Sequence, residues 1–267
     1  MKVSAILCTL NEADNLDNII YNLQSLRGAE IIIVDGGSKD GSFEKLKNIK
    51  SSKVIKVNDK GLLSQRLAGI KLATNELIFM FNADDYLSGI DLENLIDELT
   101  DKNLDGLNIS LSASKPKTFW EKGWNLYFSV CAGESKNSKV LGRPCLTYKK
   151  LFQDVKDEEG IFNEDTYLKY EQERLFGELN YEYSEQQIPR KVPNSLVANI
   201  IQFKRYGVSD ASVARNNITK WYSLLYHSFI RIALLRSSKM IAQGRPQYFI
   251  FTFIFGLVRG FYLIKGK

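Results

Sequence analysis

The chain has 267 residues, of which 44% are hydrophobic and 25% charged, with a formal net charge of +5. This length suits one large domain with a helical appendage, and the sequence holds no internal repeat, low-complexity tract or long linker. Its three scattered cysteines (Cys8, Cys131 and Cys145) lack metal-ligand spacing and suit a reducing compartment. The opening apolar run soon meets Asn11 and Glu12, so no signal peptide is expected.

Strands and helices alternate over the first part of the chain. The expected strands are 3–10, 30–34, 53–57 and 77–81, and the expected helices lie around 16–23, 43–49 and 63–73. The first helix is expected to open on capping and acidic residues and to bury Leu16, Ile19, Ile20 and Leu23, which recur at helical spacing. Strands that alternate with helices predict an α/β fold with a parallel sheet and right-handed crossovers.

Polar residues follow three of these strands, at 9–12, 35–38 and 84–85. In a doubly wound sheet such strand ends lie on one edge and converge on a nucleotide. Asp84 and Asp85 are adjacent carboxylates that repel each other, so the pair predicts a hard divalent cation that bridges to phosphate oxygens. The alternative is an ordinary strand-to-turn junction, where Asp is a common turn residue. The chain has no dinucleotide-binding or P-loop glycine pattern, which disfavours a dehydrogenase and a P-loop NTPase.

The order and spacing of these motifs resemble the nucleotide-sugar-binding half of GT-A fold glycosyltransferases of family 2. Residues 9–12 stand for the family's Thr-x-Asn-Glu, residues 34–42 for its Val-Asp-Gly-Gly-Ser-x-Asp-Gly-Ser loop, and residues 82–85 for its Asp-x-Asp-Asp metal motif. In the last motif Asn82 replaces an Asp and removes one negative charge. The resemblance covers about residues 3–86 and implies a mostly parallel GT-A sheet flanked by helices.

The resemblance also implies roles for single residues. The implied nucleotide-sugar-binding residues are Thr9, Asn11, Glu12, Asp35, Gly36, Arg66 and Asp84. Asp85, with Asp84 beside it near the ribose, is the implied ligand of a Mn²⁺ or Mg²⁺ cofactor that bridges the diphosphate. For Arg66 the other interpretation is a solvated helix face.

Glu164 and Asp165 resemble the family's Glu-Asp motif, which opens a helix. In inverting members the Asp is the general base, so the resemblance implies Asp165 as the catalytic base with Glu164 beside it. A helix N-terminus favours an ionised carboxylate, and a general base must reach the acceptor hydroxyl. An acidic pair that merely caps a helix is the alternative.

Positive charge gathers toward the C-terminus. Residues 199–267 hold 11 Lys and Arg against one acid, Asp210, whereas residues 1–198 hold 25 basic and 30 acidic residues. We therefore expect a catalytic domain over 1–198, with a nucleotide-sugar-binding half (1–110) and an acceptor-binding half (111–198). Residues 199–267 form a basic, aromatic-rich helical region. Within it Gln202, Arg205 and Tyr206 resemble the Gln-x-x-Arg-Trp motif of membrane polysaccharide synthases and are acceptor-binding candidates, an ordinary amphipathic helix being the alternative.

Aromatic and aliphatic helices with interspersed Lys and Arg suit the surface of an anionic membrane. The last apolar stretch falls short of the ~20 residues of a transmembrane helix. We therefore expect a membrane-associating extension, peripherally attached at the cytoplasmic face. Nucleic-acid binding is disfavoured by the apolar density, while packing on the catalytic domain and a homodimer through these helices are alternatives.

The expected function is the transfer of a sugar from a nucleoside-diphosphate donor to a hydroxyl of a glycan or lipid-linked acceptor, with inversion of the anomeric configuration. The expected donors are UDP-sugars. The expected setting is assembly of cell-surface polysaccharide or lipopolysaccharide. Two alternatives come from other classes. A catalytically degenerate membrane scaffold is suggested by Asn82, and a sugar nucleotidyltransferase would carry a Gly-rich basic loop where this chain has residues 9–12.

Overall fold

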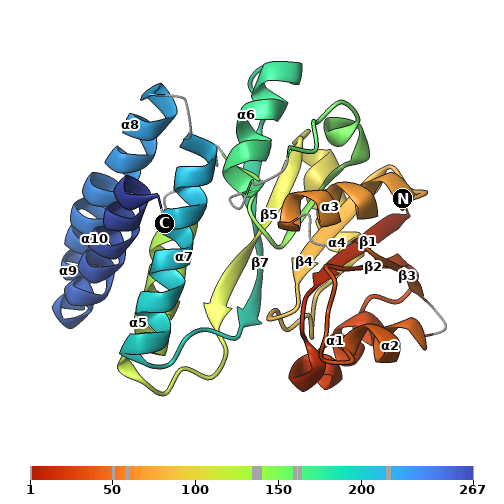
Figure 1. Cartoon of the computed structure of the whole chain (residues 1–267), viewed down its shortest axis with the longest axis horizontal. Coiled ribbons are helices and arrows are strands. Elements are labelled where there is room, and N and C mark those ends of the chain that lie inside the picture. The colour runs from red at the N-terminus through yellow and green to blue at the C-terminus, as the bar shows by residue number, and fades with distance from the viewer. Residues whose placement is uncertain are drawn as a thin grey trace.

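In a computed structural model, the chain forms a seven-stranded sheet with helices on both faces and a layer of C-terminal helices at one side (Figure 1). The structure describes residues 2–49, 52–57, 61–133, 140–158, 161, 164–214 and 218–266.

The sheet has the strand order β3-β2-β1-β4-β6-β5-β7. Its strands are β1 (Val3–Thr9), β2 (Glu30–Asp35), β3 (Ser52–Lys56), β4 (Leu77–Asn82), β5 (Gly106–Ala113), β6 (Cys145–Tyr148) and β7 (Tyr181–Arg190). Strand β6 runs antiparallel to both of its neighbours, and every other pairing is parallel. The prediction of a mostly parallel α/β sheet is confirmed.

Two apolar cores lie on the two faces of the sheet. Strand β4 is buried throughout its apolar run, because Phe79 and Phe81 enter one core while Ile78 and Met80 enter the other. The first core is closed by α1 (Leu16–Ser25), α2 (Ser42–Lys47) and α4 (Leu92–Asp101), the second by α3 (Gly61–Leu72), the short turn η2 (Lys149–Phe152) and α6 (Glu164–Phe176). A strand covered on both faces reads as a continuous hydrophobic run, which is why its position was predictable.

Helix α1 departs from its prediction in two ways. It follows a single 3₁₀ turn, η1 (Ala13–Asn15), and neither element has a side-chain cap hydrogen bond. Ile20 is 39% exposed, whereas Asn22 is fully buried. The polar side chains at the start of this helix therefore do not cap it, and buried Asn22 contacts the protein interior.

The C-terminal layer contains α7 (Leu196–Ala214), α8 (Ile218–Tyr226), the π-helical η3 (His227–Arg236), α9 (Ser237–Ala242), η4 (Pro246–Tyr248) and α10 (Phe249–Lys265). Helix α5 (Phe119–Gly133) packs on this layer through Trp124, whose ring contacts those of Phe203, Phe251 and Phe255. The expected boundary at 198 falls in the first turn of α7, and the expected boundary at 110 falls within β5. Helix α5 thus packs with the C-terminal layer, although the division by sequence placed it in the acceptor-binding half.

The carboxylate of Glu30, at the start of β2, accepts hydrogen bonds from side chains of β1, of β3 and of the segment before β4. Burial alone would raise the pKa of Glu30, but hydrogen bonds from Lys53, Ser4 and Thr74 lower it to about 2. Since a glutamate in an unfolded chain titrates near pH 4.3, the stabilisation is complete above that pH and is lost as the pH falls toward 2.

We expect Glu30→Gln to lower the free energy of unfolding at neutral pH by about 2 kcal/mol. In urea titrations this gap should close as the pH falls from about 5 to about 2, whereas exposed Glu44→Gln should show no gap. A gap that is constant with pH contradicts the assignment.

Candidate active site

The predicted convergence of strand ends is present at the carboxyl edge of the sheet. Thr9 lies opposite Asp35 in the β1–β2 register, and Cys8 lies opposite Asn82 in the β1–β4 register. Thr9 is 2% exposed, and its buried hydroxyl has no hydrogen-bond partner among the residues that the structure describes. The ends of β1, β2 and β4 therefore form one site.

The loops after β1 and β2 hold each other in place. Asp35 is fully buried, and its carboxylate accepts hydrogen bonds from the backbone N–H groups of Gly37 (2.9 Å) and Ser38 (2.8 Å). Asn11, at φ +55°, donates its N–H to the Ser38 hydroxyl (2.8 Å). A Cβ at position 36 would lie 2.4 Å from the Gln65 Nε2 of α3, so a larger residue there would require this side chain to move. These contacts fix the two loops as one rigid rim.

Asp84 and Asp85 have different environments although they are adjacent. Asp85 is fully buried, and its carboxylate accepts from Arg190 Nε (2.6 Å) and from the Asn82 backbone N–H (2.8 Å). The Asp84 side chain is 48% exposed and lies 3.7 Å from Arg190. Each oxygen of Asp85 thus accepts one hydrogen bond from the protein, whereas Asp84 is open to a ligand. The assignment of Asp85 and Asp84 as metal ligands stays a prediction.

The chemistry of Asp84 suits a shared divalent ion. Burial by neighbouring groups raises the pKa of Asp84, Arg190 opposes this shift, and the charges of Asp85 and Glu12 add to it. A cation beside Asp84 would reverse that penalty. Within the described part of the chain, no cluster of three or more His, Cys, Asp or Glu could hold a metal ion. The residues present fit Mg²⁺ or Mn²⁺ held by one or two carboxylates together with substrate phosphates, not an all-protein cage.

Three asparagines of η1 and α1 hold the loop that carries these aspartates. Asn15 and Asn18 donate their side-chain amides to the carbonyl of Ala83 (2.7 and 3.0 Å), and Asn22 donates to the carbonyl of Asp85 (2.7 Å). Sequence reasoning missed this role, although the spacing of the asparagines on one helical face was a usable signal. The amides set the position of the loop against the first core.

The end of β7 holds the same loop from the other side. Tyr86 donates its N–H to the carbonyl of Pro189 (2.8 Å), and Lys191 donates its N–H to the carbonyl of Asp84 (2.9 Å). This pairing brings Arg190 to Asp85 and was not predicted. The carboxylates of Asp84, Asp85, Glu164 and Asp165 require positive charges nearby. The sequence did not show which arginines supply these charges.

Arg66 links the metal motif to the Glu-Asp motif. It is 3% exposed, and its Nη2 lies 3.1 Å from Asn82 Oδ1 and 3.0 Å from Glu164 Oε1. The solvated-face alternative for Arg66 is therefore wrong. Because Asn82 is neutral, Glu164 carries the negative charge opposite this arginine.

Glu164 and Asp165 form the first turn of α6, as predicted. Burial and the charge of Asp165 raise the pKa of Glu164, and Arg66 and Arg143 oppose this shift. The Asp165 side chain is 35% exposed, and its Oδ1 lies 3.0 Å from Arg143 Nη1. Arg143 is almost fully buried, and its Nε and Nη2 have no hydrogen-bond partner among the described residues. Sequence reasoning also missed Arg143, which orients the candidate base.

The predicted acceptor residues separate on α7. Tyr206 is partly buried, and burial raises the pKa of its hydroxyl, while Gln202, Arg190 and Arg259 oppose this shift. Arg205 lies on the exposed surface. The structure therefore brings Gln202 and Tyr206 toward the charged site and leaves Arg205 outside it.

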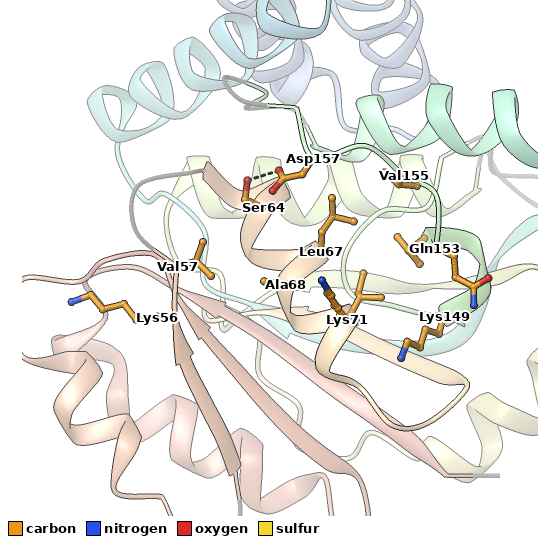
Figure 2. A pocket seen from close by; sticks show the side chains of 12 residues that line it. Lys56, Val57, Ser64, Leu67, Ala68, Lys71, Lys149, Gln153, Val155 and Asp157 are labelled. Carbon is orange, nitrogen blue, oxygen red and sulfur yellow. Dashed lines mark hydrogen bonds between the residues drawn. The ribbon is translucent and has the colours of Figure 1, made fainter.

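A cavity of about 690 Å³ lies apart from this carboxylate site, between α3 and the segment 149–157 (Figure 2). Lys71, Lys149 and Asp157 line it, and the Ser64 hydroxyl donates to Asp157 (2.5 Å). None of the predicted site residues is among the residues that line it. The cavity is therefore not the predicted donor site.

Comparison with known proteins supports the same family. The profile of Glycosyl transferase family 2 matches residues 4–150. The cholesterol galactosyltransferase of Borreliella burgdorferi is 29% identical over 163 residues, which cover 53% of this chain and 46% of the relative. The dolichol-phosphate mannosyltransferase of Pyrococcus furiosus is 30% identical over 164 residues, which cover 59% of this chain and 44% of the relative. The matches thus span less than half the length of either relative.

Solved structures share the fold. S. aureus TarS 1-349 in complex with UDP-GlcNAc aligns with a TM-score of 0.54 at 15% identity, covering 100% of this chain and 93% of that one. The complex of the same protein with UDP aligns with a TM-score of 0.53. At this identity the likeness shows a GT-A-like fold, and the family profile covers more than half of the sequence. The chain belongs to glycosyl transferase family 2.

Proposed function

We propose that this enzyme transfers a sugar from a nucleoside-diphosphate donor, with UDP-sugars first among the candidates, to a hydroxyl of a lipid-linked glycan, with inversion at the anomeric carbon. The observation that carries the proposal is a chain of contacts between the two motifs. Arg190 lies 3.7 Å from half-exposed Asp84 and donates to the carbonyl of buried Arg143, which pairs with part-exposed Asp165. A UDP-GlcNAc complex of a structural neighbour supports the donor class. Two relatives named for lipid substrates support the acceptor class.

The donor occupies the rim formed by the loops after β1 and β2 in this proposal. Its proposed contacts are Thr9, Asn11, Glu12, Asp35, Gly36 and Arg66, with Asp84 as the metal ligand. A divalent ion at Asp84 would stabilise the negative charge on the departing diphosphate. Arg190, which lies 3.7 Å from Asp84, adds a fixed positive charge beside the same group.

The proposed chemistry is a single displacement. The acceptor oxygen forms a bond to the anomeric carbon while the bond from that carbon to the diphosphate oxygen breaks, and Asp165 takes the acceptor's proton. Arg143 holds the Asp165 carboxylate through its ion pair, and Glu164 keeps the start of α6 fixed through Arg66. One displacement on one face inverts the anomeric configuration.

The acceptor approaches from the side of α7, where Gln202 and Tyr206 lie. We place the reaction in the assembly of cell-surface polysaccharide or lipopolysaccharide, at the cytoplasmic face of the membrane. Support comes from the lipid substrates named for the two relatives and from the basic, apolar C-terminal helices.

Nucleotide binding tests the donor site directly. We expect UDP with Mn²⁺ to raise the melting temperature of the wild type. At a ligand concentration a hundredfold above Kd, the free energy of unfolding should rise by about 2.7 kcal/mol. GDP, CMP and dTDP serve as competing ligands in the same thermal-shift panel. Asp84→Asn should lose the Mn²⁺-dependent part of the shift and keep its ligand-free melting temperature, because Asp84 is half exposed. Asp101→Asn, at the end of α4, is the matched control. Absence of any nucleotide shift, or a Mn²⁺-dependent shift that survives Asp84→Asn, contradicts the proposal.

A further inference from the structure

The outer surface of the C-terminal layer is unusually apolar. Of the 21 large hydrophobic side chains that are exposed in the described part of the chain, 16 lie between Leu196 and Ile264. A concentration of exposed apolar side chains in one part of a molecule marks an interaction site. The catalytic chemistry uses none of these side chains.

The exposed side chains form rows at helical spacing. Tyr222, Tyr226, Ile230 and Leu234 recur every four residues along α8 and η3, and each is 37–61% exposed. A second row, Ile250, Leu257, Phe261 and Ile264, runs along α10 at 39–57% exposure. These helices form the layer farthest from the sheet (Figure 1). We call the two rows together the docking surface.

The charge around the docking surface is of one sign. The single acid of this layer, Asp210, is fully buried and accepts two hydrogen bonds from Arg259 (2.6 and 3.0 Å). Arg231, Lys239 and Arg245 are exposed, and no carboxylate is exposed among the described residues from 199 to 266. An apolar surface flanked only by cations is complementary to anionic lipid headgroups.

Helix α10 does not have the packing of an isolated membrane span. The stretch Pro246–Lys265 is long and apolar enough to cross a bilayer by length and composition. However, Phe251 and Phe255 of its inner face are buried in the aromatic core shared with α5 and α7. A Cβ at Gly207 of α7 would lie 2.3 Å from the carbonyl oxygen of Arg259, so the two backbones are in close contact. A span would break this packing and separate the Asp210–Arg259 pair in hydrocarbon, at high cost.

We propose that the docking surface binds an anionic phospholipid bilayer, with the helices lying in the plane of the interface and none crossing it. The inference deepens the proposed function, on which it rests for the lipid nature of the acceptor. Helix α7 packs directly against α10 and also carries Gln202 and Tyr206, so a docked enzyme presents its acceptor side next to the bilayer.

Vesicle binding tests this proposal on the whole chain of 267 residues. Co-sedimentation with vesicles of phosphatidylcholine, with and without phosphatidylglycerol, is measured at low and high salt. We expect binding to anionic vesicles to be at least about tenfold tighter than to neutral ones, and weaker in high salt. The double variant Ile230→Glu/Leu234→Glu should lose about tenfold or more in affinity, because two apolar groups of the docking surface no longer enter the interface. Leu72→Glu, which alters a similarly exposed leucine on α3, should bind as the wild type does.

Several results would overturn the proposal. Equal binding of the double variant and the wild type excludes this surface, and equal binding to neutral and anionic vesicles excludes the charge complementarity. An epitope placed after residue 267 that is protected from protease in sealed vesicles shows a spanning helix instead. A dimer that the double variant converts to monomer, without vesicle binding by the wild type, assigns the surface to a second copy of the chain.

UDP release without vesicles should be equal in the double variant and the wild type. Absence of vesicle binding by a wild type that still releases UDP thus refutes docking alone, whereas absent UDP release in the wild type refutes the proposed function.

Discussion

Asp165→Asn is expected to lower the rate of UDP release by a factor of about 10²–10⁴, the usual contribution of a general base. The amide cannot take the proton of the attacking hydroxyl, but it keeps the shape and the polar contact with Arg143. The measurement is UDP release from a UDP-sugar, with water or a soluble glycan as acceptor. The rise in melting temperature caused by UDP and Mn²⁺ should be unchanged, because Asp165 lies outside the proposed donor contacts.

An exposed aspartate provides the control for this substitution. Asp154→Asn alters a solvent-exposed carboxylate in the segment before α6 and should leave both readouts at their wild-type values. If Asp165→Asn retains the wild-type rate within about threefold, Asp165 is not the base. In that case the Glu-Asp motif of this chain only begins α6.

The largest expected loss of stability comes from Arg190→Met. This change leaves Asp85, which has no exposed surface, without its charge partner. Removing one member of a buried ion pair costs about 3–5 kcal/mol, because the remaining charge is uncompensated. For a chain of this length the melting temperature should fall by about 6–20 °C. Urea unfolding of the ligand-free protein measures the free energy directly.

A double variant separates the charge effect from lost packing. Arg190→Met/Asp85→Asn removes both charges and should recover part of the loss that Arg190→Met causes alone. Lys191→Met, next in the chain and exposed, should change the free energy of unfolding by less than about 0.5 kcal/mol. No recovery in the double variant would show that Asp85 and Arg190 do not stabilise each other.

Sequence reasoning placed β3, an edge strand, within one residue, and it also placed three strands that are buried on both faces. Strands β1, β2 and β4 read as continuous apolar runs, and the turn residues after them marked their ends. Strand β7 was not predicted, because it is an edge strand in which polar residues such as Glu185 and Gln187 break the apolar pattern. An edge strand depends on its neighbour β5 for its conformation, and a single sequence does not show that neighbour.

The site was predictable as a set of motifs but not as a charge network. Adjacent residues at the end of a strand point in different directions, so the pair Asp84–Asp85 could not show which carboxylate is buried. That outcome depends on Arg190, which lies 105 positions away from Asp85 in the chain. Arg143 was visible in the sequence, but its partner Asp165 is set by the packing of α6 on the sheet. Long-range pairing of this kind has no local signature.

The backbone bonds between the end of β7 and the loop after β4 also set a distance. Five residues, 191–195, separate Arg190 from the first residue of α7, and a segment of that length spans at most about 17 Å. The loop that carries Asp84 and Asp85 is therefore held within a short, fixed distance of the first helix of the C-terminal layer. An enzyme docked on a bilayer as proposed works at a fixed height above the headgroups. It would act as a ruler that selects acceptors by the spacing between their lipid anchor and the hydroxyl to be glycosylated.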